Sequence, residues 1–228
     1  MRRSEVNKII RDAHKFIASF GVKLPPFAHW SPEQLKSTLP QAPDIHANRL
    51  GWDITDFGQG NFAERGLVLL TTRNGSPANL AKGKGIVYAE KLMISRNNQS
   101  APMHRHNIKT EDIINRGGGR LVVELFTARP DGSIDASAEV RVMTDARERR
   151  LPAGTRLRLE PGESVTLFPH HWHGFWGEGD VMIGEVSSVN DDLTDNIFRD
   201  PVGRFATIDE DEPPLHLLVS DYDTWLAP

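Results

Sequence analysis

The sequence predicts a mainly β protein, an antiparallel sandwich or barrel preceded by N-terminal α-helices. From Gly51 onward, short β-like runs alternate with turn-forming residues, which is typical of antiparallel sheets. Before Gly51, apolar residues recur instead at helical spacing. The chain has 228 residues, of which 38% are hydrophobic and 19 are glycine. This composition is that of an ordinary globular chain, and the length allows one sizeable core.

Two helices are expected in the first fifty residues. The first spans residues 6–20 and ends before Gly21, a residue that suits a helix C-cap. The second begins at Pro32, because Ser31 offers an N-cap and Gln34 completes a capping box. Both helices are expected to pack onto the sheet.

The β-like runs and turns continue to about residue 190. The runs cover residues 67–72, 86–95, 121–127, 140–143, 164–168 and 181–189. Turns are expected at residues 73–75, 116–119, 130–133, 152–154 and 161–162. Since no repeat or low-complexity linker divides the chain, we expect a single domain. It would comprise a helical extension (1–50), a β-barrel core (51–190) and an acidic, irregular C-terminal strap (191–228).

The charge balance excludes several classes of partner. The 27 basic and 31 acidic residues give a net charge of −4, which provides no long-range attraction to nucleic acid or anionic lipid. No apolar run approaches the roughly 18 residues of a membrane span, and no signal peptide is visible. We therefore expect a cytoplasmic protein that binds neither nucleic acid nor membrane.

The chain contains no cysteine, which excludes disulfides, thiolate metal sites and cysteine nucleophiles. Any bound metal must therefore be held by histidine and carboxylate side chains. Of the nine histidines, five fall within one stretch of about seventy residues: His104, His106, His170, His171 and His173.

The spacing of these histidines predicts a metal site. In a strand, His104 and His106 point to the same face and can hold one ion between them, and a following turn can return Glu111 to the same point. One histidine from the second cluster (His170, His171 or His173) would complete a set of three nitrogens and one oxygen. The alternative, ordinary polar residues on a solvated strand, does not explain so specific a combination of spacings.

The ligand types narrow the choice of metal. Imidazole and carboxylate without sulfur suit a divalent first-row ion, and a catalytic site leaves positions open for substrate. Mn²⁺ is the first choice, with Fe²⁺, Co²⁺, Ni²⁺ and Zn²⁺ as alternatives.

The same residues carry a resemblance to the cupin superfamily. The spacing of His104, His106, Glu111 and Gly118 is similar to the first cupin motif, with Asn98 where that motif usually begins with glycine. The second motif, residues 162–173, is looser. The resemblance implies a cupin double-stranded β-helix, also called a jelly-roll barrel.

A narrower resemblance, to the D-lyxose isomerase family, covers about residues 85–215. The matching segments are residues 103–119, 159–167, 172–176, 184–196, 203–205 and 210–212. It implies a homodimeric cupin barrel with N-terminal helices and a metal-dependent activity that interconverts D-lyxose and D-xylulose. D-mannose and D-fructose would be secondary substrates. In that family the aromatic segment supplies the fourth metal ligand, which here falls on His173.

Aldose–ketose isomerisation also needs a general base and an acid. Glu185 is the expected base, because it lies in an apolar strand where burial would raise its pKa; the alternative is a half-exposed strand carboxylate. Lys109 lies between His106 and Glu111 and is the expected acid, with a pKa lowered by the adjacent cation; the alternative is a surface lysine.

Further residues are candidates for sugar recognition. Asp191, Asp192 and Arg204 would contact hydroxyl groups. Trp172, Phe175 and Trp176 would form an apolar wall against the sugar, with core packing as the alternative. His170 and His171 would then be neighbours of the site.

Two other functions fit a cupin, because fold does not determine function. One is an Fe(II) dioxygenase, and the other is a non-catalytic sugar-binding or sensor protein. The pair of Lys109 and Glu185 favours an isomerase, since binding alone does not require an acid and a base beside the ion.

Overall fold

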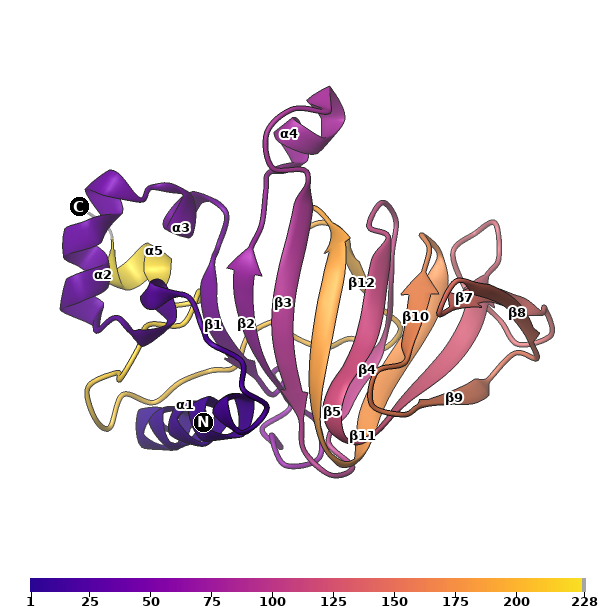
Figure 1. The fold of residues 1–228 in the computed structure, drawn as a ribbon, viewed down its shortest axis with the longest axis horizontal. Coiled ribbons are helices and arrows are strands. Elements are labelled where there is room, and N and C mark those ends of the chain that lie inside the picture. Colours follow the sequence, from indigo (N-terminus) through magenta and orange to yellow (C-terminus); the bar gives the residue numbers. More distant parts are fainter. Residues whose placement is uncertain (227–228) are drawn as a thin grey trace.

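The computed structural model describes residues 1–226, in which most of the helices lie at one side of a strongly bent antiparallel sheet (Figure 1). The helices are α1 (Arg3–Ser19), η1 (Pro26–His29), α2 (Pro32–Thr38), η2 (Leu39–Gln41), α3 (Asp44–Ala47), α4 (Pro77–Lys82) and α5 (Tyr222–Trp225). Helix α1 begins three residues before the expected start, and α2 begins at Pro32 as expected. Within residues 1–226 no helix combines the length and apolar character needed to cross a membrane.

The predicted capping box of α2 is confirmed. The hydroxyl of Ser31 accepts a hydrogen bond from the backbone N–H of Gln34 (3.2 Å), and the Gln34 side chain accepts one from the N–H of Ser31 (2.9 Å). These two bonds satisfy donors that would otherwise be unpaired at the start of the helix, which is why the sequence signal was informative.

Twelve strands form the β structure. They are β1 (Gly51–Thr55), β2 (Leu67–Arg73), β3 (Tyr88–Ser95), β4 (Ser100–His106), β5 (Glu111–Ala128), β6 (Ile134–Asp135), β7 (Val140–Thr144), β8 (Arg147–Leu151), β9 (Thr155–Leu159), β10 (Ser164–Leu167), β11 (His171–Ser188) and β12 (Asn196–Phe198). All pairings between these strands are antiparallel, as predicted.

Two long strands, β5 and β11, pair with each other and belong to both walls of the barrel. At one end, β3 pairs with the second half of β11 and β10 with the first half of β5. At the other end, β4 pairs with the first half of β11 and β9 with the second half of β5. The strand pair therefore brings residues from β3, β4, β5 and β11 to one interior (Figure 1).

The glycines at residues 117–119 do not form the expected turn, because β5 continues through them. Gly118 has a φ of +96°, and a Cβ on it would lie 2.2 Å from the carbonyl oxygen of Asp180 in the paired strand. The pairing of β5 with β11 shifts register between Glu178 and Val181 at the same place. Glycine here allows the strand pair to bend sharply, and the predicted turn at residues 116–119 is wrong because the glycines form an irregularity within β5.

The core lies between the walls of the barrel, and its side chains come from alternate positions along each strand. Leu121, Val123 and Leu125 of β5 point inward and are fully buried. A second cluster joins α1 to the outer face of the β1–β3 sheet through Ile10 and Trp52. The N-terminal helix therefore covers one face of the barrel, as expected for an amphipathic helix on a sheet.

The C-terminal segment links the barrel to α1. Arg3 is fully buried and forms ion pairs with Glu210 (2.6 Å) and Asp221 (2.9 Å). The backbone N–H of Val219 donates to the carbonyl oxygen of Trp52 in β1 (2.8 Å). The last two residues of the expected strap, 227–228, lie outside the described residues.

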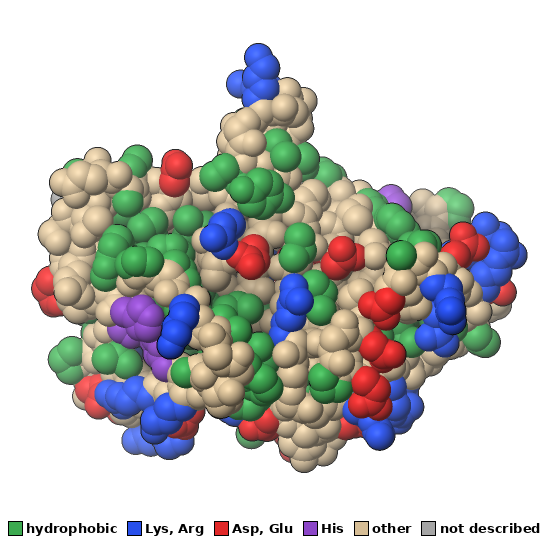
Figure 2. All heavy atoms as spheres, viewed as in Figure 1, with side chains coloured by type: hydrophobic (Ala, Val, Ile, Leu, Met, Phe, Trp, Pro, Cys, Tyr) green, Lys and Arg blue, Asp and Glu red, His purple; other side chains and the backbone are tan. Residues whose placement is uncertain are grey.

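Three histidines with no expected role lie together beside α1, where histidine side chains gather on the face shown in Figure 2. The ring of His14 lies 4.9 Å from that of His29 and 5.4 Å from that of His216, measured between centroids. Its Nε2 atom is buried without a hydrogen-bond partner among the described residues. Burial, assisted by the two neighbouring imidazoles, lowers the pKa of His14 from 6.5 to about 4.

Replacing His14 by phenylalanine is expected to make the stability less dependent on pH. Because the pKa of His14 is lower in the folded state, the unfolded chain binds more protons between about pH 4 and 6.5, and stability is lost as the pH falls through that window. Phenylalanine keeps a ring beside Trp52 but cannot be protonated. Thermal unfolding across this window should show a smaller fall in Tm for the variant than for the wild type, and equal falls would contradict the assignment.

Candidate metal centre and active site

A cavity opens into the barrel and is lined by residues of β3, β4, β5 and β11. Including the open space at its mouth, it encloses about 550 Å³. One part of its wall is apolar, with Phe57, Phe175 and Phe198. The other part is polar and carries the expected metal ligands together with Lys109 and Glu185.

The structure brings together His104, His106, Glu111 and His173. Their ligand atoms all lie within 4.8 Å of one another. The first two come from β4, Glu111 begins β5, and His173 in β11 is the direct cross-strand partner of His104. Glu111 Oε1 lies 3.2 Å from His106 Nε2 and 3.0 Å from His173 Nε2. This arrangement can hold a metal ion.

Backbone carbonyl groups orient the three imidazoles. The Nδ1 atoms of His104, His106 and His173 lie 2.9, 3.1 and 3.1 Å from the carbonyl oxygens of Pro102, Asp195 and His171, respectively. An Nδ1–H that donates to a carbonyl leaves Nε2 unprotonated and free to coordinate.

Three atoms of this group are buried without a hydrogen-bond partner among the described residues: His106 Nε2, Glu111 Oε1 and His173 Nε2. Unpaired buried polar atoms are costly and uncommon, and here they all face one another. A divalent cation between them would satisfy all three. The residues present therefore fit the metal that the sequence predicts.

The protonation states also favour coordination. Burial lowers the pKa of His104 and of His106, and neighbouring positive groups lower them further, so both imidazoles are neutral at pH 7. Burial would raise the pKa of Glu111, but the nearby Lys109 ammonium and the imidazole of His106 hold it well below its usual value. Neutral imidazole and ionised carboxylate are the forms that bind metal ions.

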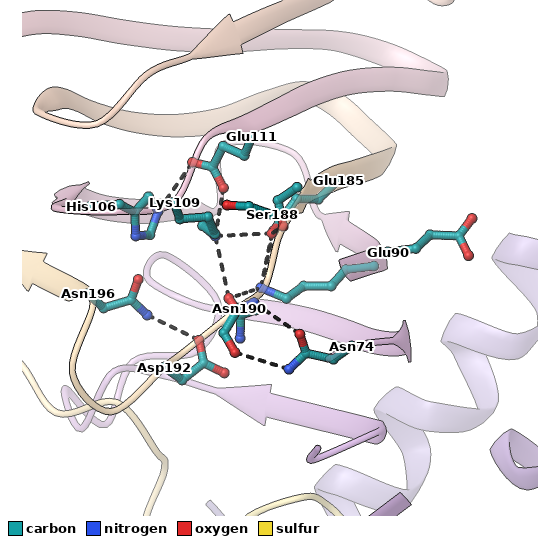
Figure 3. A network of polar contacts seen from close by, with 12 residues as sticks. Asn74, Glu90, His106, Lys109, Glu111, Glu185, Ser188, Asn190, Asp192 and Asn196 are labelled. Atoms are coloured by element: carbon teal, nitrogen blue, oxygen red, sulfur yellow. Dashed lines mark hydrogen bonds and ion pairs between the residues drawn. The ribbon is translucent and has the colours of Figure 1, made fainter. Parts of the chain in front are cut away.

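Next to the metal group, Glu185 lies between two buried lysines (Figure 3). Lys109 Nζ lies 2.7 Å from Glu111 Oε2 and 3.0 Å from Glu185 Oε1. From the other side, Lys91 Nζ of β3 donates to Glu185 Oε2 at 3.2 Å. The hydroxyl of Ser187 donates to Glu185 Oε1 at 3.1 Å. The structure thus places a carboxylate and two ammonium groups beside the ligands.

The groups of the protein itself shift the pKa values of Glu185 and Lys109 in the opposite directions to those expected. Burial raises the pKa of Glu185, but the ammonium groups of Lys109 and Lys91 outweigh that effect and lower it. Burial lowers the pKa of Lys109, but the carboxylates of Glu111 and Glu185 outweigh that effect and raise it. Lys91 is 94 positions from Glu185 in the sequence, and no local pattern places the two side chains together.

Asp195 is a second residue that the sequence analysis did not assign. Its buried carboxylate accepts three backbone N–H groups, from Asn107, Ile108 and Lys109, each at 2.9 Å. Its carbonyl oxygen lies 3.1 Å from His106 Nδ1. Asp195 therefore orients a ligand and the loop that carries Lys109. The one available signal was its position inside the segment 184–196 that resembles the family.

Two of the three residues expected to contact hydroxyl groups line the cavity. Arg204 forms ion pairs with Asp192 (2.9 Å) and with Asp53 of β1 (2.7 Å), a buried partner that the sequence analysis missed. Asp191 does not line the cavity. Its carboxylate instead accepts hydrogen bonds from the backbone N–H groups of Leu193 and Thr194, which closes a local turn.

The expected aromatic wall is divided by strand alternation. Phe175 points into the cavity, on the same face of β11 as His173. Trp172 and Trp176 do not line the cavity. The Trp172 indole donates to the carbonyl of Gly132 (3.1 Å), and the guanidinium of Arg156 lies 5.5 Å from the centre of the Trp176 ring. Successive side chains of a strand point to opposite faces, so one β11 face could not supply all three residues.

Comparisons with known proteins identify the family. A family model described as D-lyxose isomerase matches residues 1–222. This chain belongs to the D-lyxose isomerase family. A D-lyxose/D-mannose isomerase of Serratia proteamaculans is 48% identical to it over the whole of both chains. Another family member, the D-lyxose/D-mannose isomerase of Escherichia coli O157:H7, is 47% identical over 97% of this chain and 98% of its own length.

Solved structures of L-ribose isomerases share the cupin fold of this D-lyxose isomerase family member. The enzyme of Cellulomonas parahominis with L-psicose has a TM-score of 0.62 and 18% identity, and the match covers 92% of this chain and 98% of that one. The enzyme of Geodermatophilus obscurus has the same TM-score and coverage with 17% identity. The predicted cupin barrel with N-terminal helices is therefore confirmed.

Proposed function

We propose that the protein is a metal-dependent aldose–ketose isomerase that interconverts D-lyxose and D-xylulose, with D-mannose and D-fructose as a second pair. The observation that carries this proposal is the group of three histidines and Glu111, which shares one cavity with Glu185 and two lysines. The D-lyxose/D-mannose isomerase activity named for the two full-length relatives supports it.

The reaction moves one proton between C1 and C2 of the sugar and another between the attached oxygens. A divalent cation held by His104, His106, Glu111 and His173 would supply Lewis-acid polarisation of the sugar carbonyl. Glu185, ionised at neutral pH, takes the proton from C2 and returns it to C1. The intermediate is the enediol or enediolate of the sugar. Glu185 Oε2 has Lys91 as its one hydrogen-bond partner among the described residues, so it keeps a lone pair for this proton.

The remaining cavity residues bind and orient the sugar. The Lys109 ammonium, held by Glu111 and Glu185, donates to a sugar oxygen and serves as the acid for the transfer between oxygens. Arg204 and Asp192 contact the distal hydroxyl groups. Phe175 packs against the carbon face of the sugar.

The proposal is tested by proton exchange. Protein loaded with Mn²⁺ is incubated in D₂O with a panel of pentoses and hexoses, and deuterium at C2 is followed by NMR. We expect incorporation and ketose formation with D-lyxose first and with D-mannose second. Absence of exchange with every sugar would contradict an isomerase, and ligand-induced stabilisation without exchange would favour the sugar-binding alternative.

Mn²⁺ is the metal we propose, with Fe²⁺, Co²⁺, Ni²⁺ and Zn²⁺ as alternatives, because nitrogen and oxygen ligands suit these ions. Metal-free protein is reconstituted with each ion in turn, and the measured turnover of each form ranks the ions. Oxygen consumption by the Fe²⁺ form would instead indicate a dioxygenase.

We also propose that the protein is a homodimer located in the cytoplasm. The homodimer is implied by the family resemblance, and the location is that expected of an enzyme of sugar metabolism such as the relatives named above. Light scattering at micromolar concentration measures the oligomeric state, and a monomer mass would contradict the dimer.

A further inference from the structure

The two lysines beside Glu185 share another partner, the side chain of Asn190. Lys91 Nζ donates to Asn190 Oδ1 at 2.6 Å, and Lys109 Nζ donates to the same oxygen at 3.4 Å. An amide oxygen has two lone pairs and can accept both bonds. Since Lys91 belongs to β3 and Lys109 to the loop before β5, this one atom connects two separate elements on either side of the carboxylate.

Asn190 is held by Asn74, which lies between β2 and α4 (Figure 3). The backbone N–H of Asn190 donates to Asn74 Oδ1 (3.0 Å), and Asn74 Nδ2 donates to the carbonyl oxygen of Asn190 (3.0 Å). The same Nδ2 group donates to the carbonyl oxygen of Asn48 (3.2 Å). The Asn74 side chain is buried, and it does not line the cavity.

These contacts form a continuous chain from outside the cavity to the expected base. Asn74 fixes the backbone of Asn190, Asn190 Oδ1 fixes the two ammonium groups, and these contact both oxygens of Glu185. Asn190 lies two residues beyond the end of β11, in a loop, where the backbone is more mobile than in a strand. The reciprocal pair of hydrogen bonds from Asn74 holds this backbone unit in place.

We propose that Asn74 and Asn190 act as a clamp that positions Lys91 and Lys109 against Glu185. Both are positioning residues, since neither lines the cavity. This inference rests on the proposed isomerase function, because it concerns the geometry of proton transfer at Glu185. It predicts that loosening the clamp slows proton transfer while metal binding is unchanged, since the side chains of Asn74 and Asn190 form their hydrogen bonds with groups other than the four metal ligands.

Asn74→Ala is the principal test, and Asn7→Ala is its matched control. Asn7 is buried in α1 and its side chain also makes three hydrogen bonds, to Glu212, Pro213 and Leu215. Both variants lose three hydrogen bonds of a buried asparagine, so their Tm values should fall by similar amounts. Only Asn74→Ala should lower kcat for D-lyxose, by about 10-fold or more, with metal content unchanged.

A deuterium isotope effect separates positioning from general destabilisation. With D-lyxose deuterated at C2, a misplaced base makes proton transfer more rate-limiting, so the isotope effect on kcat should rise in Asn74→Ala. A variant that merely contains less active protein would show a lower kcat with the wild-type isotope effect. Asn190→Ala, which removes the contact to the lysines but leaves the backbone bonds to Asn74, should show the same rise.

The outcomes are distinct. The comparison requires a wild type that turns over D-lyxose. If Asn74→Ala and Asn190→Ala then have the same kcat per folded enzyme and the same isotope effect as Asn7→Ala, the proposed clamp is wrong. If Asn74→Ala does not fold, Asn190→Ala alone decides by the same criteria. If the metal-loaded wild type exchanges no proton with any sugar, the proposed function fails and this assignment fails with it.

Discussion

Replacing His173 by alanine is expected to abolish both metal binding and turnover. His173 Nε2 lies 3.0 Å from Glu111 Oε1 and is one of the three buried atoms without a hydrogen-bond partner among the described residues. Without the His173 imidazole, only three protein ligands remain: His104, His106 and Glu111. Elemental analysis should find about one metal ion per wild-type chain and almost none in the variant. Added Mn²⁺ should raise the Tm of the wild type alone, since a ligand stabilises only the state that binds it.

The control for this experiment is His171→Ala. His171 lies two residues away in β11, outside the metal group, where its Nδ1 accepts a hydrogen bond from the backbone N–H of Phe168 (3.2 Å). Its carbonyl oxygen, which orients His173, is retained in alanine. We expect metal content and activity close to those of the wild type. The opposite pattern, with metal lost in His171→Ala and kept in His173→Ala, would exchange the two assignments.

Replacing Glu185 by glutamine is expected to preserve the metal and reduce turnover by at least about 100-fold, the usual effect of losing an acid–base group. Glutamine has nearly the same shape but cannot accept the proton from C2. Glu185 is not among the four metal-binding side chains, so metal content should stay the same. Exchange at C2 in D₂O and kcat with D-lyxose should fall together, because both require the same proton transfer.

Glu90→Gln provides the matched control on the neighbouring strand. Glu90 lies in β3 beside Lys91, but its carboxylate faces outward and contacts Arg73 and Thr72. The same chemical change at this position should leave C2 exchange intact. Near-wild-type turnover in Glu185→Gln would show that the base is another residue.

Local patterns in the sequence were sufficient for much of the site. The two-residue spacing of His104 and His106 places both on one face of a strand, and the structure finds both in β4 beside Glu111. Trp172 and Trp176 lie one and three positions from His173. Because successive side chains of a strand alternate between faces, both point away from the face that carries the ligand, and the expectation that they contact the sugar is wrong.

Other residues depend on contacts between distant parts of the chain. Lys91 and Glu185 are 94 positions apart and meet because β3 pairs with the second half of β11. Asp53 of β1 forms an ion pair with Arg204 because the C-terminal segment passes beside β1. No local pattern marks Lys91 or Asp53 as different from any other strand lysine or aspartate.

Composition and local patterns were enough to predict the β-barrel class, the absence of sulfur ligands, the start of α2 and the residues that can hold a metal ion, because each of these depends on neighbouring residues and on residue type. The tertiary structure alone decided the electrostatics of the site. Whether burial or charge controls the pKa of Glu185 depends on which ammonium groups the folded sheet brings within about 3 Å of it. Coulomb interactions fall with distance in space, and that distance is decided by strand pairing between segments that are remote in sequence.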